Sequence, residues 1–140
     1  MAAFNKINSF VEDVAEKVHN LGADQLVLAL TAAANAPVAT NTVLANLTQI
    51  SYTNLSTRNL TTSSSAQSSG TYKLVIADLV LTASGGSVAA FRYLVVYNDT
   101  PTSPADPLIG WYDYGSDLTL ANGETLTVDF DGTNGLLTIA

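Results

Sequence analysis

Residues 70–100 read GTYKLVIADLVLTASGGSVAAFRYLVVYNDT, and this stretch decides the fold class of the chain. Two runs rich in Val, Leu, Ile, Phe and Tyr flank the tetrapeptide SGGS at residues 84–87. Long apolar runs on both sides of a glycine turn predict a β-hairpin. Each run carries apolar residues at both odd-numbered and even-numbered positions, which point to opposite faces of a strand. Both strands are therefore expected to be covered on both faces. The stretch therefore predicts the central hairpin of an all-β domain.

The first of these runs contains a change of parity. Leu74 and Ile76 have even numbers, whereas Leu79 and Leu81 have odd numbers. Successive side chains of a strand point to opposite faces, so this shift requires a bulge or a bend. We place it at Ala77–Asp78.

Further strand signals are short and closely spaced. The dipeptide Asn122-Gly123 is typical of a hairpin turn and is expected to join residues 118–121 to residues 124–130. Residues 43–52 fit either a strand or a loose turn of helix. Additional strands are predicted at residues 25–31, 108–114 and 136–139. Eight or so strands with frequent turn signals predict a mainly β chain with a jelly-roll-like β-sandwich.

An amphipathic helix is predicted near the N-terminus, within residues 4–22. Its apolar stripe recurs at spacings of three and four and consists of Ile7, Phe10, Val11, Val14, Ala15, Val18 and Leu21. Ser9 and Glu12 fit a capping box and Gly22 a C-terminal stop, which favours a helix over about residues 9–20. The helix is expected to lie across the β core. Alternatively, the segment before it, with Phe4 exposed, is an arm that docks on a neighbouring subunit.

Length and composition predict one domain, residues 1–140, made of an arm and helix (1–22) and a β-sandwich (25–140). The sequence has no cysteine, which excludes disulfides and thiolate metal sites. It has no standard secretion signal and no apolar run of the roughly 20 residues that span a membrane. We expect a soluble protein that is made in the cytoplasm and has no membrane partner.

Charge is the most unusual property of the composition. Charged residues make up 12% of the chain, against about 25% in an ordinary soluble domain. A chain with so few charges covers its surface with Ser, Thr and Asn or hides part of it against partners, which favours a subunit of a larger assembly. Every charged residue after Arg92 is acidic, and the net charge is −7. This argues against direct binding to nucleic acid and suggests an acidic face turned to solvent.

Residues 51–71 are rich in small hydroxyl side chains. Twelve of these twenty-one residues are Ser or Thr, and the segment contains no proline. This composition is typical of an exposed loop or an edge strand. Together with the N-terminal arm it forms the predicted interface, for which the candidate residues are Phe4, Ile7, Tyr52, Leu55 and Leu60.

No catalytic, metal-binding or cofactor-binding residue is predicted, and the chain is not expected to be an enzyme. The single histidine, His19, lies near the expected helix C-terminus, where the backbone dipole favours an imidazole, and no Gly-x-Ser-x-Gly motif accompanies it. Asp129, Asp131 and Asn134 are spaced like the ligands of a calcium loop, but the acidic residue that closes an EF-hand loop is missing. Asp-Gly and Asn-Gly are also ordinary turns. The sequence leaves both interpretations of this turn, a cation site and an ordinary turn, open.

Aromatic residues Trp111, Tyr112 and Tyr114, with Asp113 and Asp117, fit two interpretations. They could form a platform for a sugar ring, because aromatic faces stack on pyranoses and carboxylates bind hydroxyls. They could equally pack in a core or an interface. The chain also has four Asn-x-Ser/Thr sites, which would matter only in a secreted protein and which we interpret as accidents of an Asn/Thr-rich sequence: Asn46, Asn54, Asn59 and Asn98.

Much of the chain resembles a family of virion proteins. The segments are FNKINSFVEDVAEKVHNLGADQLVLALT, PVATNTVLANLTQI, SSAQSSGTYKLVIADLVLTASGGSVAAFRYLVVYNDT and PLIGWYDYGSDLTLANGETLTVDFDGTNGLLTIA. They look like the capsid cement, or decoration, proteins of short-tailed bacteriophages such as a Bordetella phage. The resemblance covers nearly the whole length and rests on overall pattern, with no catalytic motif.

The resemblance implies a jelly-roll-like, non-enzymatic structural protein that acts as a homodimer on the virion. Such a protein binds the outer surface of the expanded capsid and bridges neighbouring subunits of the major capsid protein. Two alternatives remain open. One is a carbohydrate-binding β-sandwich on the virion that attaches to host glycans, and the other is a tail or fibre component.

Overall fold

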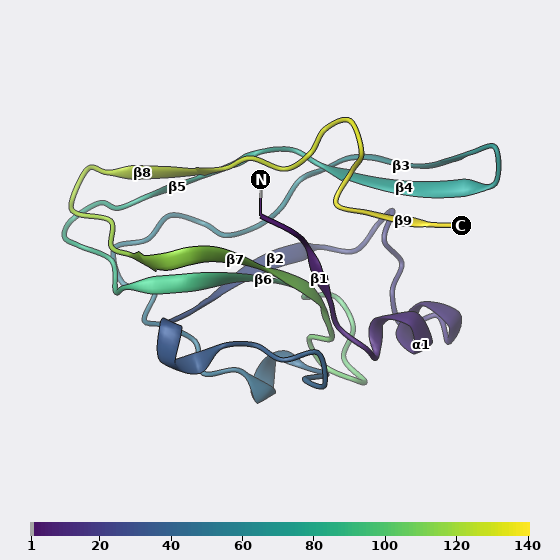
Figure 1. Cartoon of the computed structure of the whole chain (residues 1–140), viewed down its shortest axis with the longest axis horizontal. Helices are drawn as coiled ribbons and strands as arrows, with labels where there is room; N and C mark the ends of the chain where they lie inside the picture. Colours follow the sequence, from purple (N-terminus) through teal and green to yellow (C-terminus); the bar gives the residue numbers. More distant parts are fainter. Residues whose placement is uncertain (1) are drawn as a thin grey trace.

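Two layers of antiparallel strands make up the computed structural model, which describes residues 2–140 (Figure 1). One layer is a four-stranded sheet in the order β1-β7-β6-β2, with bounds Asn5–Lys6 for β1, Leu108–Leu118 for β7, Phe91–Asn98 for β6 and Leu26–Thr31 for β2. The other layer contains two smaller sheets. Their orders are β3-β4-β9 and β5-β8, with bounds Thr62–Ser68, Thr71–Ile76, Leu137–Ile139, Leu79–Thr82 and Thr125–Val128 respectively.

A break in the chain separates the two small sheets. Strands β4 and β5 are consecutive in sequence and are interrupted at Ala77–Asp78, as predicted. The Asp78 carboxylate accepts a hydrogen bond from the Phe130 backbone N–H at 2.9 Å. The break is therefore tied to the segment that leaves β8.

The predicted central hairpin is wrong in its pairing. Strand β5 pairs with β8, and β6 pairs with β2 and β7, so residues 83–90 cross from one layer to the other. The glycines do form a bend, with φ of +85° at Gly85, and Asn54 holds it by donating from Nδ2 to the Ser87 carbonyl at 3.1 Å. A glycine bend suits a crossover between layers as well as a hairpin, so the local signal does not determine which strands pair.

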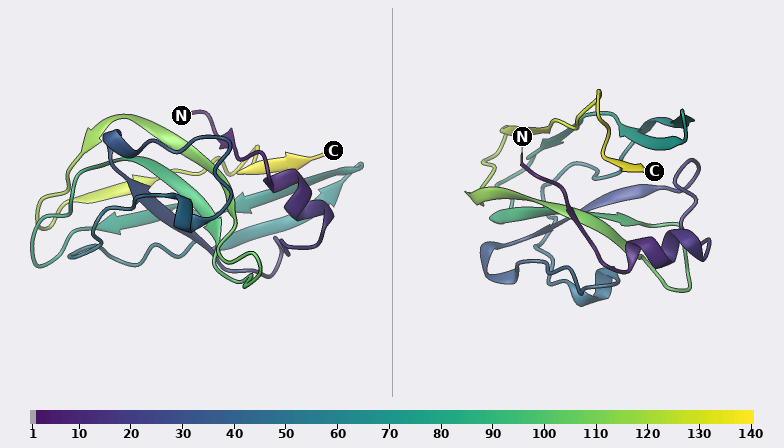
Figure 2. Two further views of the ribbon diagram at one scale, coloured as in Figure 1. Left: turned by 90° about the horizontal axis from the view of Figure 1, so that it is seen from below. Right: turned by 45° about the vertical axis from the view of Figure 1, so that its right-hand side comes forward.

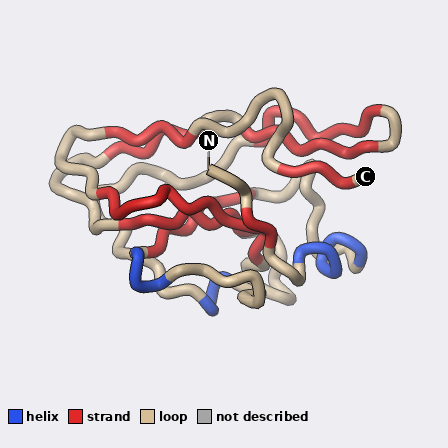
Figure 3. Tube along the Cα trace, in the orientation of Figure 1, coloured by secondary structure: helices blue, strands red, loops and turns tan. Residues whose placement is uncertain are grey.

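Strand β6 is covered on both faces, as predicted. Leu94 and Val96 belong to the main core between the layers, while Val95 and Tyr97 belong to a second apolar cluster on the outer face. The outer cluster includes Leu44 of the short 3-10 helix η2 (Leu44–Asn46); another such turn, η1, spans Ala33–Asn35 (Figure 3). Residues 43–52, whose structure the sequence leaves open, thus contain a single helical turn.

The Asn122-Gly123 turn forms, but it is not a hairpin. Glu124 donates its N–H to the Ala121 carbonyl at 2.9 Å, and Gly123 has a φ of +87°. Strands β7 and β8 on either side of this turn belong to different layers. This prediction is therefore correct for the turn and wrong for the strand pairing.

The N-terminal helix is shorter than predicted. Helix α1 spans Phe10–Ala15, and Lys17 has a φ of +64°, which no helix continues through. Ser9 makes no side-chain capping hydrogen bond, so the predicted capping box is absent. Before the helix, β1 pairs with the edge of β7, which makes the arm part of the sheet in this chain.

The core joins these parts in one cluster. Phe10 and Leu21 from the N-terminal segment pack with strand residues such as Phe91 and Ile109. The mainly β class, with antiparallel sheets arranged as a sandwich, is confirmed, whereas the jelly-roll connectivity stays a prediction. Across residues 2–140, no helix is long and apolar enough to cross a membrane.

Candidate interaction surfaces

Strand β3 is an exposed edge strand, as residues 51–71 predict. It lies at one side of the β3-β4-β9 sheet, and all its residues except Thr62 are exposed. Its hairpin with β4 turns at Ser69 and Gly70, whose φ values are both positive at 50° and 84°. The hairpin projects at one end of the molecule, beside α1 and the C-terminus (Figures 1 and 2).

The backbone of β3 has hydrogen-bonding groups on its open side. Ser65 lies opposite Leu74, whose carbonyl accepts from the Leu136 N–H on the side of β4 away from β3. Ser65 and Leu74 are therefore a pair without hydrogen bonds between them, and the N–H and C=O of Ser65 point away from β4. Gln67, two residues further, has the same orientation. These groups are a template for another strand.

The usual protections of an edge strand are absent from most of β3. No charged residue and no proline lies between Arg58 and Lys73. The register shift in its pairing with β4 lies at its start, between Thr62 and Ser64. Natural edges are commonly blocked by Lys, Pro or bulges, so residues 64–68 form an edge that is free to pair.

Two of the five predicted interface residues lie in the core and offer no surface to a partner. Ile7 is fully buried and Leu60 is 5% exposed. Ile7 packs in the outer apolar cluster and Leu60 in the main core. The expectation that these two residues contact a partner is therefore corrected: their apolar side chains are used to hold the chain's own termini and loops to the sandwich.

The other three predicted interface residues, Phe4, Tyr52 and Leu55, are partly buried against the main core. The Phe4 ring lies 5.0 Å from the Tyr112 ring. Tyr52 accepts from the Leu30 N–H at 3.0 Å, and the Arg58 guanidinium lies 3.6 Å from its ring centre. Burial raises the pKa of the Tyr52 hydroxyl. These contacts give all three residues a role within the chain.

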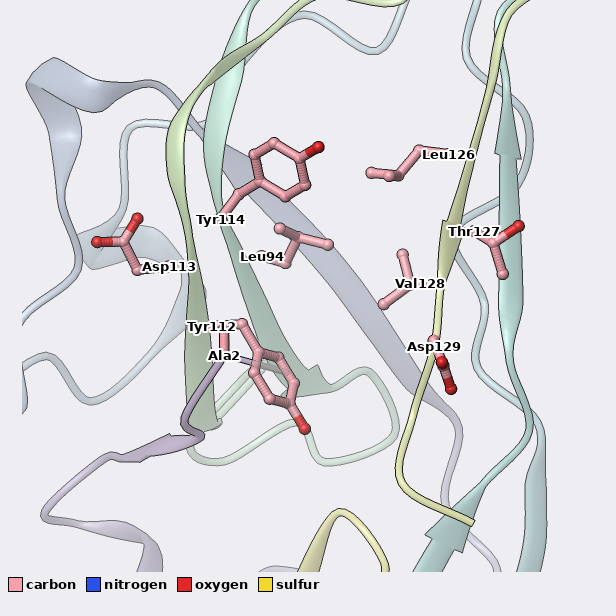
Figure 4. Close-up of a pocket in the computed structure, with 9 residues that line it drawn as sticks. All are labelled: Ala2, Leu94, Tyr112, Asp113, Tyr114, Leu126, Thr127, Val128 and Asp129. Atoms are coloured by element: carbon pink, nitrogen blue, oxygen red, sulfur yellow. The ribbon is translucent and has the colours of Figure 1, made fainter.

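The predicted sugar platform is divided between two faces of β7. Trp111 packs with the outer cluster, whereas Tyr112 packs against the main core. Figure 4 shows Tyr112 and Tyr114 pointing toward β8 and Asp113 pointing away. The Asp113 carboxylate binds Arg92 through two hydrogen bonds of 2.8 and 3.0 Å. The three aromatic residues therefore do not form one stacking surface.

An apolar groove, which the sequence did not reveal, opens between β7 and β8. Leu94, Tyr112 and Tyr114 line one side, and Leu126 and Val128 face them from the other (Figure 4). Its volume is about 130 Å³. Burial, with a smaller effect of the Asp131 charge, raises the pKa of Tyr112 to about 12. The one sequence signal that could have indicated a face of this groove is the alternation of Leu126 and Val128 with Thr125 and Thr127.

His19 belongs to a buried polar cluster and lies beyond the end of α1. Its Nδ1 lies 3.1 Å from Nδ2 of Asn98, which also donates to the Asp24 carboxylate at 2.6 Å. Burial lowers the pKa of His19, and this effect outweighs the negative charges of Asp13 and Asp24, which raise it. The helix-dipole explanation for His19 is thus wrong. Asn98 is fully buried, so its Asn-x-Thr site is inaccessible in the folded chain.

In the turn that resembles a calcium loop, the Asp131 carboxylate is hydrogen-bonded to other groups of the same turn. Asp131 accepts from the N–H groups of Thr133 and Asn134 at 2.9 and 2.7 Å, and from Asn134 Nδ2 at 2.8 Å. These bonds lower the pKa of Asp131. Lys73 donates to the Thr133 carbonyl at 2.8 Å and brings a positive charge to the loop. Within residues 2–140 no group of three or more His, Asp or Glu side chains could hold a metal ion.

Comparisons with protein-family models, with curated proteins and with solved structures found no match for this chain.

Proposed function

We propose that this chain is a non-enzymatic structural protein of a bacteriophage virion. It binds the outer surface of the capsid and stabilises it by bridging neighbouring subunits of the major capsid protein. The observation that carries the proposal is the open, uncharged edge of β3. The sequence resemblance to phage cement proteins and the scarcity of charged residues also support it.

The edge of β3 supplies a mode of association. Two copies of the chain pair their β3 strands antiparallel about a two-fold axis, through the outward N–H and C=O groups of Ser65 and Gln67. No like charges oppose each other in this pairing, because the strand has none. A dimer presents two copies of each remaining surface and can therefore contact two capsid subunits at once.

Binding to the assembled shell stabilises that shell by mass action. A protein that binds the closed capsid and not its free subunits raises the free energy of capsid opening by RT ln(1 + [L]/Kd) for each site, where [L] is the free concentration of that protein. The stabilising effects of many copies bound to one lattice add up. A dimer binds the capsid more tightly than a single chain, because the first bound copy holds the second at a high effective concentration near its own site. The acidic C-terminal third, turned to solvent, keeps decorated capsids apart by repulsion.

The test uses capsids that lack the protein. Purified chain is added, bound copies are measured by sedimentation, and capsid opening is followed during heating and in EDTA. We expect binding and a higher opening temperature. Capsids that open at the same temperature with and without the protein would show that the proposal is wrong.

A matched pair of proline variants links this function to β3. Ser65→Pro removes an outward N–H from the β3 edge and leaves the pairing with β4 intact. Thr127→Pro makes the same change on the edge of β8, in another sheet. We expect Ser65→Pro to abolish self-association and weaken capsid binding, while Thr127→Pro retains both. Sedimentation equilibrium measures the first and capsid co-sedimentation the second.

A further inference from the structure

The groove between β7 and β8 has an open strand edge along one side. Strand β8 pairs with β5 alone among the described strands. On the far side of β5, Thr82 uses both backbone groups toward Ser56: its N–H donates to Ser56 Oγ and its C=O accepts from the Ser56 N–H. Thr82 lies opposite Thr125, so this pair is not hydrogen-bonded across β5 and β8. The N–H and C=O of Thr125, and of Thr127 two residues on, therefore point to the open edge.

The side chains of β8 divide cleanly between two faces. Leu126 and Val128 point into the groove toward Leu94, whereas Thr127 points away from it (Figure 4). An added strand would place alternate side chains between the layers, against Leu126 and Val128. Its other side chains would lie beside the threonines, on the outer face.

The groove is too small for most small-molecule ligands. Its 130 Å³ lies well below the roughly 300–1,000 Å³ of typical ligand pockets. Two or three aliphatic side chains of a strand fit such a volume, and the open edge supplies the hydrogen bonds that an extended backbone needs.

Charge at the ends of β8 selects the occupant. Glu124 comes directly before this strand and Asp129 directly after it. Within residues 2–140 the one ion pair joins Arg92 to Asp113, so neither flanking carboxylate has a Lys or Arg partner. A second copy pairing β8 with β8 would bring four carboxylates together. In contrast, a partner segment with a basic residue at each end places one positive charge beside Glu124 and another beside Asp129.

We propose that the β7–β8 groove binds an extended segment of a partner protein, which adds as an antiparallel strand to β8. The segment carries alternating aliphatic residues between two basic residues. This interface is separate from β3 and does not depend on the proposed function.

The probe is the peptide acetyl-Lys-Val-Thr-Val-Thr-Lys-amide, titrated into the ¹⁵N-labelled full chain and followed by NMR. We expect saturable shifts of the β8 amides and of the groove residues Leu94 and Tyr112. Replacing both lysines with glutamate should weaken binding by at least about tenfold at low salt, with a smaller difference at high salt. The absence of saturable shifts at β8 would overturn the proposal.

N-methylated peptides test strand addition without altering the protein. In the antiparallel arrangement, the peptide threonines lie opposite Thr125 and Thr127 and direct their N–H groups to β8. Methylating the threonine nitrogens should therefore abolish binding, while methylating the valine nitrogens should leave it within about threefold. Equal binding by the two peptides would contradict strand addition and leave the capsid proposal untouched.

Protein variants locate the site. Leu126→Thr should weaken the peptide by about tenfold, whereas Val80→Thr, a change at a half-exposed position of the neighbouring strand β5, should not. Thr127→Pro should abolish binding and Ser65→Pro should not. Binding that survives Thr127→Pro in a folded variant would overturn the proposal.

Discussion

Replacing Asn98 with alanine should destabilise the fold strongly, because this side chain is the centre of a buried network. It is fully buried at the end of β6. Its Nδ2 donates to the Asp24 carboxylate at 2.6 Å and lies 3.1 Å from His19 Nδ1, and its Oδ1 accepts from the Thr100 N–H at 3.1 Å. Asn98→Ala removes all three interactions and leaves their partners without these bonds.

The size of the effect follows from these three bonds. A hydrogen bond to a charged group contributes about 1.5–3 kcal/mol, and a neutral one about 0.5–1.5 kcal/mol. Asp24 is partly exposed and can be rehydrated, so the lower part of the summed range applies, which is about 3 kcal/mol. The entropy of unfolding of a chain of 140 residues is about 0.3 kcal/mol per kelvin. Asn98→Ala should therefore lower the Tm by about 10 °C.

Thermal unfolding followed by circular dichroism and calorimetry measures this shift. The control is Asn59→Ala, which alters another Asn-x-Thr site at an exposed position and should change the free energy of unfolding by less than about 0.5 kcal/mol. A Tm for Asn98→Ala within 3 °C of the Tm of the Asn59→Ala control, a margin of about 1 kcal/mol, would refute the idea that this network stabilises the fold.

Two further predictions concern stability. Burial lowers the pKa of His19 in the folded chain, so the unfolded chain binds the proton more tightly, and the free energy of unfolding should fall as the pH drops below about 6.5. Denaturant unfolding at pH 7.5 and 5.5 should show this loss of stability in the unmodified chain, whereas the His19→Gln variant should not show it. Gly135→Ala should destabilise by about 2 kcal/mol more than Gly70→Ala. Both glycines have positive φ, but an added Cβ at Gly135 would lie 2.6 Å from the Leu74 carbonyl oxygen, whereas at Gly70 it meets open space. Equal unfolding free energies for the two glycine variants would contradict this.

A last prediction of the same kind concerns the attachment of the N-terminal strand. A Cβ on Gly110 would lie 2.5 Å from the Asn5 carbonyl oxygen and from the Phe4 ring. Gly110→Ala should therefore displace β1 from β7 and speed hydrogen exchange of the β1 amides, with little change at β2. Unchanged exchange at Asn5 and Lys6 would show that β1 tolerates the added methyl group.

Features that depend on one segment were predictable from the sequence. Apolar residues at both parities correctly indicated that both faces of β6 are covered, and the parity shift located the break at Ala77–Asp78. The hydroxyl-rich composition identified β3 as an exposed edge. In each case the signal is local alternation or composition, and no knowledge of the partner strand is needed.

Strand pairing and the polar cluster could not be predicted in this way. The bends at Gly85 and Gly123 suit a crossover between layers as well as a hairpin, and packing of the two layers decides between them. The apolar spacing of Val18 and Leu21 continues the helical pattern, although the helix has already ended before Lys17. Leu21 is apolar because it packs on the core, but it does so from a turn and not from a helix. His19 and Asn98 lie far apart in sequence, so their contact exists only once the sandwich has formed.

Electron cryomicroscopy of the bacteriophage virion to which we propose that this chain belongs tests the central proposal most directly. The account predicts density for the chain on the outer surface of the capsid, bridging neighbouring major capsid protein subunits, with β3 strands of two copies paired about a two-fold axis. Density confined to the tail or its fibres, or no density on the capsid, would contradict it.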